Sequence, residues 1–149
     1  MRYNTRLSDA IHILAYIDLR GDLKPSSSVI AESLNTNASV VRQILQVLKI
    51  AKLTVSQQGV SGTTLAKPAK DISVFDIYQA VSPSSLIKVD HDTNLKCSVG
   101  GNIQPVLEEK FNQIINAAEV KMRNITLADI EHEIILGSKT NERTPTLPG

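Results

Sequence analysis

SSSVIAESLNTNASVVRQILQVLKIAKLTVSQQGVSGTTL, residues 26–65, is the stretch that decides the fold. Apolar residues at helical spacing predict a short helix over residues 28–34 and a longer amphipathic helix over residues 38–51. The polar turn Asn35-Thr36-Asn37 separates them, and Asn37 is a good N-cap for the second helix.

Two short apolar segments follow, and both have β character. Residues 53–55 and 63–65 are predicted strands, and Gly59 and Gly62 between them are typical of a tight hairpin tip. A helix, a turn, a helix and a β-ribbon in this order indicate a winged helix-turn-helix. In that motif the second helix enters the DNA major groove, so binding to double-stranded DNA is the leading hypothesis.

The remaining chain is predicted to be helical around one long connector. Residues 7–19 form a first helix, a capping box at Ser73 opens a helix to Val81, and another at Thr126 opens a last helix to about Leu136. The fold class is mainly α with a small β-wing: a winged helix-turn-helix plus a long dimerisation helix. The expected parts are a DNA-binding domain (1–81), a connector loop carrying Cys97 (82–104), dimerisation helices (105–136) and a flexible tail (137–149).

The long helix that starts at Pro105 carries an apolar seam with steps of three and four residues. Such a seam on a lone helix would be left exposed, which implies a partner helix, most simply that of a second copy. The predicted homodimer interface is Leu107, Phe111, Ile114, Ala118, Met122 and Ile125.

Charge is unevenly distributed along the 149 residues. Residues 1–70 hold nine Lys/Arg and four Asp/Glu, whereas the remainder holds seven Lys/Arg and eleven Asp/Glu. A basic first half fits a nucleic-acid partner. No signal-peptide run and no stretch long enough to span a bilayer is evident, so we expect a cytoplasmic protein without a membrane partner.

The polar face of the second helix should lie toward base edges and flanking phosphates. Arg42 is the strongest candidate, because its planar fork can donate two hydrogen bonds to guanine. Bland alternatives remain: Arg42 as a solvated arginine, Ser27 or Ser28 as a helix cap, and the wing glutamines as ordinary surface. The predicted DNA-binding residues are Arg2, Arg6, Ser27, Ser28, Ser39, Val40, Arg42, Gln43, Gln46, Gln57, Gln58, Ser61 and Thr63.

Cys97 is the single cysteine of the chain and is a candidate redox sensor. Neighbouring Lys96 and the backbone N–H groups near Gly100 could lower its pKa, although a small buried cysteine is the alternative. Asp90-His91-Asp92 reads as a charged turn, and we predict no metal site. No phosphate loop, nucleophile elbow or acid/base pair is present, so we expect no enzyme. A winged-helix module that binds protein instead of DNA is the alternative function.

Several motifs together resemble the Rrf-type (Rrf2) winged-helix regulators of bacteria, in their YwnA/CymR-like branch without an iron–sulfur cluster. The motifs are residues 30–34, 40–45, 65–67, 71–81, 97–104 and 125–129. The resemblance implies a homodimeric regulator, a repressor, that reads a pseudo-palindromic operator. Its signal stays open between redox control at Cys97, a small-molecule effector and a partner enzyme.

Cluster-binding members of that family use three connector cysteines, and this chain departs from the pattern. If Cys97 stood for the middle one, the outer positions would fall near His91 and Ile103. Because Ile103 cannot ligate iron, we expect no cofactor.

Overall fold

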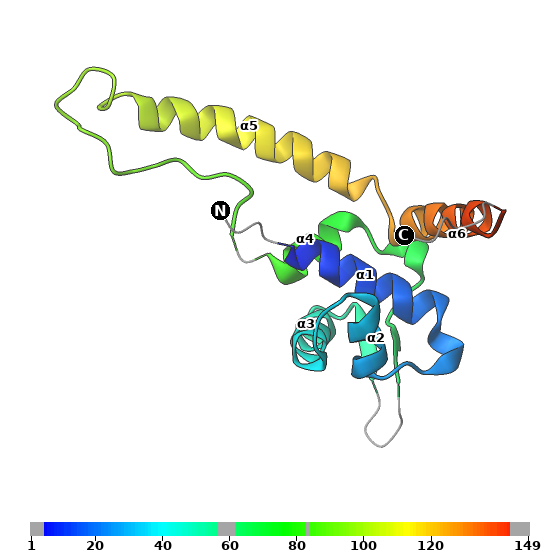
Figure 1. Ribbon diagram of the computed structural model, residues 1–149. Coiled ribbons are helices and arrows are strands. Elements are labelled where there is room, and N and C mark those ends of the chain that lie inside the picture. The colour runs from blue at the N-terminus through cyan, green and yellow to red at the C-terminus, as the bar shows by residue number, and fades with distance from the viewer. Residues whose placement is uncertain (1–4, 57–61, 83, 144–149) are drawn as a thin grey trace.

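The computed structural model describes residues 5–56, 62–82 and 84–143. It confirms a mostly helical winged helix-turn-helix with a two-stranded antiparallel wing (Figure 1). Within the described residues no helix is long and apolar enough to cross a membrane. The elements are α1 (Arg6–Leu19), η1 (Gly21–Leu23), α2 (Ser27–Ser33), α3 (Ala38–Ile50), β1 (Thr54–Ser56), β2 (Thr63–Leu65), η2 (Ala69–Asp71), α4 (Val74–Val81), α5 (Ile103–Arg123) and α6 (Leu127–Arg143).

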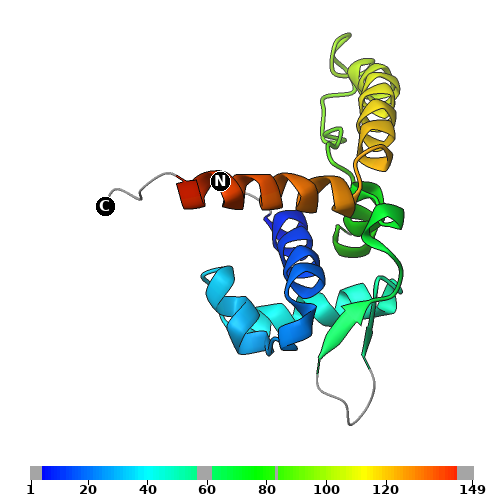
Figure 2. The same ribbon diagram turned by 90° about the vertical axis from the view of Figure 1, so that its right-hand side faces the viewer.

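A single apolar core holds α1, α3 and α4 together. We call residues 5–82 the headpiece. Its centre is α1, whose Ile13 and Leu14 are fully buried, as is Leu48 from α3 and Ile77 from α4. Figure 2 shows α6 crossing one side of α1 while α3 and the wing lie on the other. The core therefore packs against the inner face of the helix-turn-helix and leaves its outer face exposed.

The turn between α2 and α3 is fixed by backbone hydrogen bonds. Asn35 adopts a left-handed φ of 52°. Its N–H donates to the carbonyl of Glu32 at 3.2 Å, and the Thr36 N–H donates to that of Ala31 at 3.0 Å. This is a Schellman ending, in which asparagine tolerates the left-handed position. The side chain of Asn37 then accepts from the Val40 N–H at 3.0 Å and caps α3, as predicted.

A second Schellman ending leads from α3 into the wing. Lys52 has a φ of 61°, and the N–H of Leu53 donates to the Leu48 carbonyl at 3.0 Å. Because Leu53 completes the helix ending, β1 begins one residue later than predicted. Val55 pairs with Thr64 in the ladder, and Gly62 has a φ of 101°. The predicted tip glycine Gly59 lies outside the described residues.

The chain then leaves the headpiece and returns as α5 (Figure 1). This 21-residue helix, about 32 Å long, contains no fully buried residue. It begins at Ile103, so Pro105 lies in its first turn, where a missing N–H costs little. At its far end, the Val74 N–H donates to Ile125 and the Leu127 N–H donates to Ile72, both at 2.8 Å. These bonds fasten the returning chain to the start of α4.

The structure corrects our expectation for the last helix. Instead of ending near Leu136, α6 continues to Arg143, so residues 137–143 are helical rather than a flexible tail. A single interior glycine such as Gly137 costs only about 1 kcal/mol, and the Thr140 hydroxyl donates to the Leu136 carbonyl at 3.0 Å. Residues 144–149 lie outside the described range.

Helix α6 also packs on the headpiece rather than along α5. Leu127, at its start, is fully buried in the headpiece core. Further along, Glu131 is 7% exposed on the side that faces α1. Burial, together with the carboxyl of Asp18, raises the pKa of Glu131 to about 8. The headpiece is therefore completed by residues that follow α5.

Candidate nucleic-acid interface

Helix α3 has a buried apolar face and an exposed face that is mainly polar. Val41, Ile44 and Leu48 are fully buried, which fixes the rotation of the helix. The residues exposed on the other side are polar Ser39, Arg42, Gln43, Gln46 and Lys49, followed by apolar Ile50 at the end of the helix, which is 75% exposed. Val40 is half-buried against the core and does not belong to that face. Four of the five predicted base-reading side chains of α3 therefore share one solvent face.

Three consecutive serines precede and open α2, and the structure separates their roles. Ser26 is the N-cap, with its hydroxyl accepting from the Val29 N–H at 3.3 Å. Ser27 is half-buried and Ser28 is exposed in the first turn. Neither therefore serves as the cap, and the Ser28 hydroxyl lies on the surface of the helix-turn-helix.

The other predicted contacts are placed only in part. Thr63 is half-buried in the strand pair nearest the tip of the wing, opposite Ser56. Arg6 is half-buried in the first turn of α1. Arg2, Gln57, Gln58 and Ser61 lie outside the described residues.

Lys24 is a candidate that the sequence analysis missed. It follows η1 with a left-handed φ of 45°. A Cβ placed on Gly62 would lie 3.5 Å from Cβ and Cγ of Lys24, so this exposed lysine lies beside the end of the wing ladder that is nearer the tip. Lys24 precedes Pro25 in a segment without a helical pattern, so nothing in the sequence indicated that it lies close to Gly62 of the wing.

The apolar side chains of α5 occupy two neighbouring faces. Leu107, Phe111, Ala118, Met122 and Ile125 of the predicted seam are half-buried within the chain itself. Phe111 borders a cleft with connector residues such as Ile87 and Val89, and near the helix end the Arg123 guanidinium lies 3.9 Å from the centre of the Phe75 ring. The exposed apolar residues of α5 are Ile103, Val106, Ile114 and Val120.

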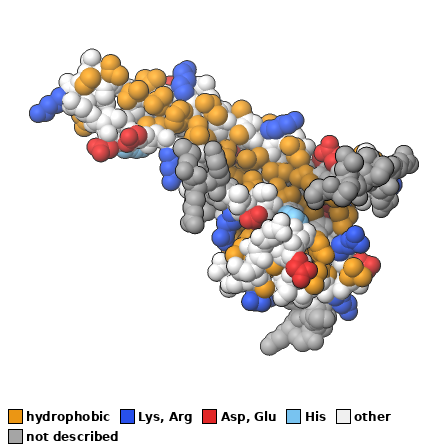
Figure 3. Space-filling model, in the orientation of Figure 1, with side chains coloured by type: hydrophobic (Ala, Val, Ile, Leu, Met, Phe, Trp, Pro, Cys, Tyr) orange, Lys and Arg blue, Asp and Glu red, His pale blue; other side chains and the backbone are white. Residues whose placement is uncertain are grey.

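Figure 3 shows hydrophobic side chains gathered along this helix. We call Val106, Ile114 and Val120, each 54–55% exposed, the open face of α5. Only Ile114 is shared with the predicted seam.

The tip of the connector is an ordered loop built around two glycines. The Thr93 hydroxyl donates to the Gly100 carbonyl at 2.6 Å, and the Gln104 amide donates to Thr93 at 2.6 Å. A Cβ on Gly100 would lie 2.5 Å from the Asn94 carbonyl oxygen, which only glycine avoids. Cys97 is exposed in this loop. Backbone N–H groups, first of Gly100 and then of Val99, lower the pKa of its thiol.

Comparison with known proteins identifies the family. Residues 3–133 match Rrf2, described as an iron-dependent transcriptional regulator. YwnA of Bacillus subtilis (strain 168), a candidate HTH-type transcriptional regulator, is 40% identical over 132 residues, covering 88% of this chain and 98% of YwnA. The chain belongs to the Rrf2 family.

Solved structures agree with this assignment. A crystal structure of a candidate DNA-binding protein is similar to this Rrf2 chain at a TM-score of 0.69 and 39% identity, covering 84% and 97% of the two chains. CymR of B. subtilis has a TM-score of 0.63 at 21% identity, covering 89% and 97%, and IscR of T. potens 0.63 at 22%, covering 100% and 94%. At those two identities the likeness concerns the fold alone. The chain is thus an Rrf2 transcriptional regulator and not an enzyme, as predicted.

The family description raises the question of whether this Rrf2 chain fits an iron–sulfur cluster. Such clusters are held by several cysteine thiolates, and Cys97 is the only cysteine in the sequence. Among the described residues no three His, Cys, Asp or Glu side chains group as metal ligands. His91 is engaged by Glu108, with Nε2 and Oε1 2.8 Å apart, and apolar Ile103 begins α5. The residues do not fit a cluster.

Proposed function

We propose that this Rrf2 chain is a dimeric, sequence-specific DNA-binding regulator that represses transcription by occupying a pseudo-palindromic operator. The observation that carries the proposal is the exposed polar face of α3, held on a rigid apolar core by Val41, Ile44 and Leu48. DNA reading needs a helix whose orientation is fixed and whose outer side chains can donate and accept hydrogen bonds. The cytoplasm, where DNA is accessible, is the expected location.

Arg42 is the residue that we expect to read a base. It is exposed in the first half of α3, and its fork can donate to O6 and N7 of guanine. Gln43 and Gln46 extend the same face, and we expect exposed Ser28 and Lys24 to contact flanking phosphates. The wing would add minor-groove contacts. Base reading supplies specificity, and the phosphate contacts supply position and salt-dependent affinity.

The proposal is tested by fluorescence anisotropy with a duplex of the chain's own promoter region across a salt series. Arg42→Ala should lower the affinity for the specific duplex by about tenfold or more and bring it toward that for a scrambled duplex. Lys139→Ala removes an equal charge from exposed α6, on the far side of α1, and should leave binding unchanged. Failure of the wild-type chain to prefer any duplex at low salt would instead favour the alternative function, a protein-binding module.

The open face of α5 supports a homodimer. Three exposed apolar side chains on one helix form a surface that a second copy of the helix can cover. Ile114→Glu with Val120→Glu should produce monomers in sedimentation velocity and weaken operator binding, because two half-sites are then read independently. Leu95→Glu changes an apolar residue that is 73% exposed on the connector and serves as the matched control. A dimer that survives the double substitution would rule out this interface.

Cys97 supports a thiol response. Its lowered pKa increases the thiolate fraction, and its exposure admits a small disulfide. The Cys97 thiolate would attack one sulfur of oxidised glutathione, forming a mixed disulfide and releasing one glutathione thiolate. We expect this adduct, seen by mass spectrometry, to weaken operator binding reversibly in the wild type and to be absent in Cys97→Ser. If the modified protein bound the operator with unchanged affinity, the thiol response would be refuted, whereas the proposal of a DNA-binding regulator would stand.

A further inference from the structure

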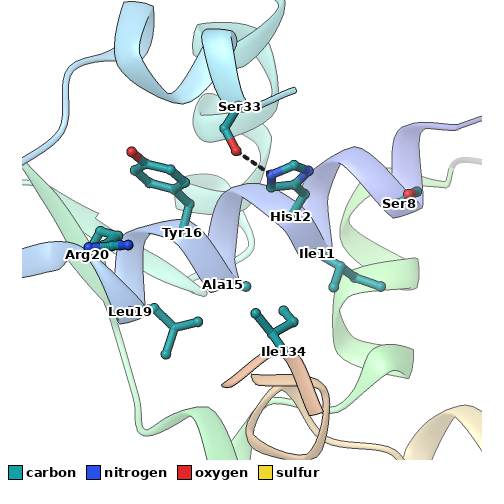
Figure 4. A pocket seen from close by; sticks show the side chains of 9 residues that line it. All are labelled: Ser8, Ile11, His12, Ala15, Tyr16, Leu19, Arg20, Ser33 and Ile134. Atoms are coloured by element: carbon teal, nitrogen blue, oxygen red, sulfur yellow. Dashed lines mark hydrogen bonds between the residues drawn. The ribbon is translucent and has the colours of Figure 1, made fainter. Parts of the chain in front are cut away.

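We propose that a pocket between α1, α2 and α6 binds a small organic anion with an apolar body, and that this anion is the effector of the regulator. The pocket has a volume of about 500 Å³, within the range of small-molecule sites. One face of α1 forms its floor, Ser33 of α2 stands on one side and Ile134 of α6 on the other (Figure 4). Anion binding is independent of the proposed DNA-binding function, and only the effector role, a change in operator affinity, rests on it.

The two sides of the pocket differ in chemistry. Figure 4 shows Ile11, Leu19 and Ile134 on the α6 side, with Ala15 at the centre. His12 and Tyr16 lie on the α2 side, and Arg20 lies at one end beside Tyr16. An aliphatic or aromatic body fits the first side, and an acid group fits the second.

Charge selects an anion over a cation. None of the nine lining residues carries a carboxylate, whereas Arg20 contributes a permanent positive charge. The guanidinium can hold a carboxylate or sulfonate through two parallel hydrogen bonds, and the Tyr16 hydroxyl can donate a third. This polar half also distinguishes the pocket from the open face of α5, whose apolar side chains suit a second copy of the chain.

A ligand in this pocket would lie beside a hydrogen bond that links α1 to the helix-turn-helix. Nε2 of His12 and Oγ of Ser33 are 2.8 Å apart, and this bond joins α1 to the last residue of α2. The Schellman turn that positions α3 begins directly after that residue. An acid group that competes for His12 would release α2, and one that accepts from both side chains would hold it.

The pocket is tested first with 1-anilinonaphthalene-8-sulfonate, an aromatic sulfonate, titrated into the full chain and followed by fluorescence. We expect saturable binding that decanoate displaces and that neutral decanol does not. Arg20→Gln should weaken binding by about tenfold, since it removes a charge-assisted pair. Ile134→Trp should fill the apolar half and abolish binding. Ile135→Trp, one residue further on α6 and outside the pocket, is the matched control, and thermal unfolding by circular dichroism verifies that each variant folds.

Three results would overturn the site: equal binding by wild type, Arg20→Gln and Ile134→Trp, equal competition by decanol and decanoate, or a change of sedimentation coefficient in the pocket variants. The last would make the pocket a contact between copies. The effector role is tested by operator affinity with saturating decanoate. It should change in the wild type and not in Ile134→Trp, which is expected to bind no decanoate, and the operator should change the decanoate affinity of the wild type by the same factor. An unaffected operator affinity would overturn the effector role, whereas a chain that binds no operator would refute the proposed function and leave the pocket result standing.

Discussion

Lys52 and Glu131 each occupy a position that is unfavourable for their side chain. Lys52 follows α3 with a left-handed backbone conformation, which is disfavoured for any residue with a Cβ. Glu131 is only 7% exposed, and such burial disfavours the charged form of its carboxyl group. Sequence alone could predict neither. Lysine is an ordinary surface residue, and the partner that buries Glu131 is α1, at the opposite end of the chain.

Lys52→Gly should stabilise the protein. Glycine adopts the φ of 61° without the Cβ clash, and part of this gain is offset by the greater freedom of glycine in the unfolded chain. We expect the free energy of unfolding to rise by about 0.5 to 1 kcal/mol in urea denaturation. Lys49→Gly, inside the same helix, should instead lower it by about 1 kcal/mol. Equal destabilisation by both would show that the left-handed position carries no strain.

Glu131→Gln should remove a pH dependence of stability. The folded-state pKa of about 8 exceeds the ordinary value of 4.5, so the folded protein holds this proton more tightly than the unfolded chain. The contribution is full below pH 4.5 and is lost as the pH rises toward 8. The variant should therefore unfold at a higher temperature than wild type at pH 8, with the difference shrinking toward pH 5. Glu133→Gln, exposed on the same helix, should follow the wild-type profile.

At the scale of single helices, capping motifs were predictable and packing partners were not. Both capping boxes are present: Ser73 with Asp76, and Thr126 with Asp129. They depend on residues three apart, so local sequence encodes them. Connector residues line a cleft beside Phe111 of the predicted seam, and that packing leaves no trace in the periodicity of α5, so the sequence could not distinguish the open face of this helix. The three consecutive serines at the start of α2 look alike in sequence, and only the structure selects Ser26 as the cap.

Ser73→Ala should weaken the start of α4. The substitution removes the hydroxyl that accepts from the Asp76 N–H at 3.0 Å, and caps of this kind contribute about 1 kcal/mol. We expect a loss of that size in the free energy of unfolding. Because Ser73 also pairs with Thr126 in an isolated bridge, hydrogen exchange should quicken at the start of α6 as well. Ser84→Ala, exposed in the connector, is the control, and equal losses would contradict the capping role.

At the scale of the whole molecule, the core of the headpiece is completed by α6, which follows the connector and α5 in the chain. We predicted a domain boundary after residue 81 because the helical pattern breaks there. Such a break does not reveal which later segment packs back against the headpiece core. Leu127→Ala should cost roughly 2 to 5 kcal/mol of unfolding free energy, since this fully buried side chain lies in the headpiece core. Ile135→Ala, 40% exposed on the same helix, should change it by less than about 0.5 kcal/mol. A small effect at Leu127 would mean that residues 5–82 are stable alone.

The return of the chain at Leu127 also orders events during synthesis. A ribosome releases the segments from the N-terminus onward, and a domain completes its folding when its last core residue has emerged. The α3 surface would therefore become rigid only after the connector and α5 have been made, because Leu127 follows them. If α5 pairs two copies as proposed, a nascent chain would carry that helix before its α3 surface becomes rigid, so the element for dimerisation would be made before the surface for DNA binding is complete.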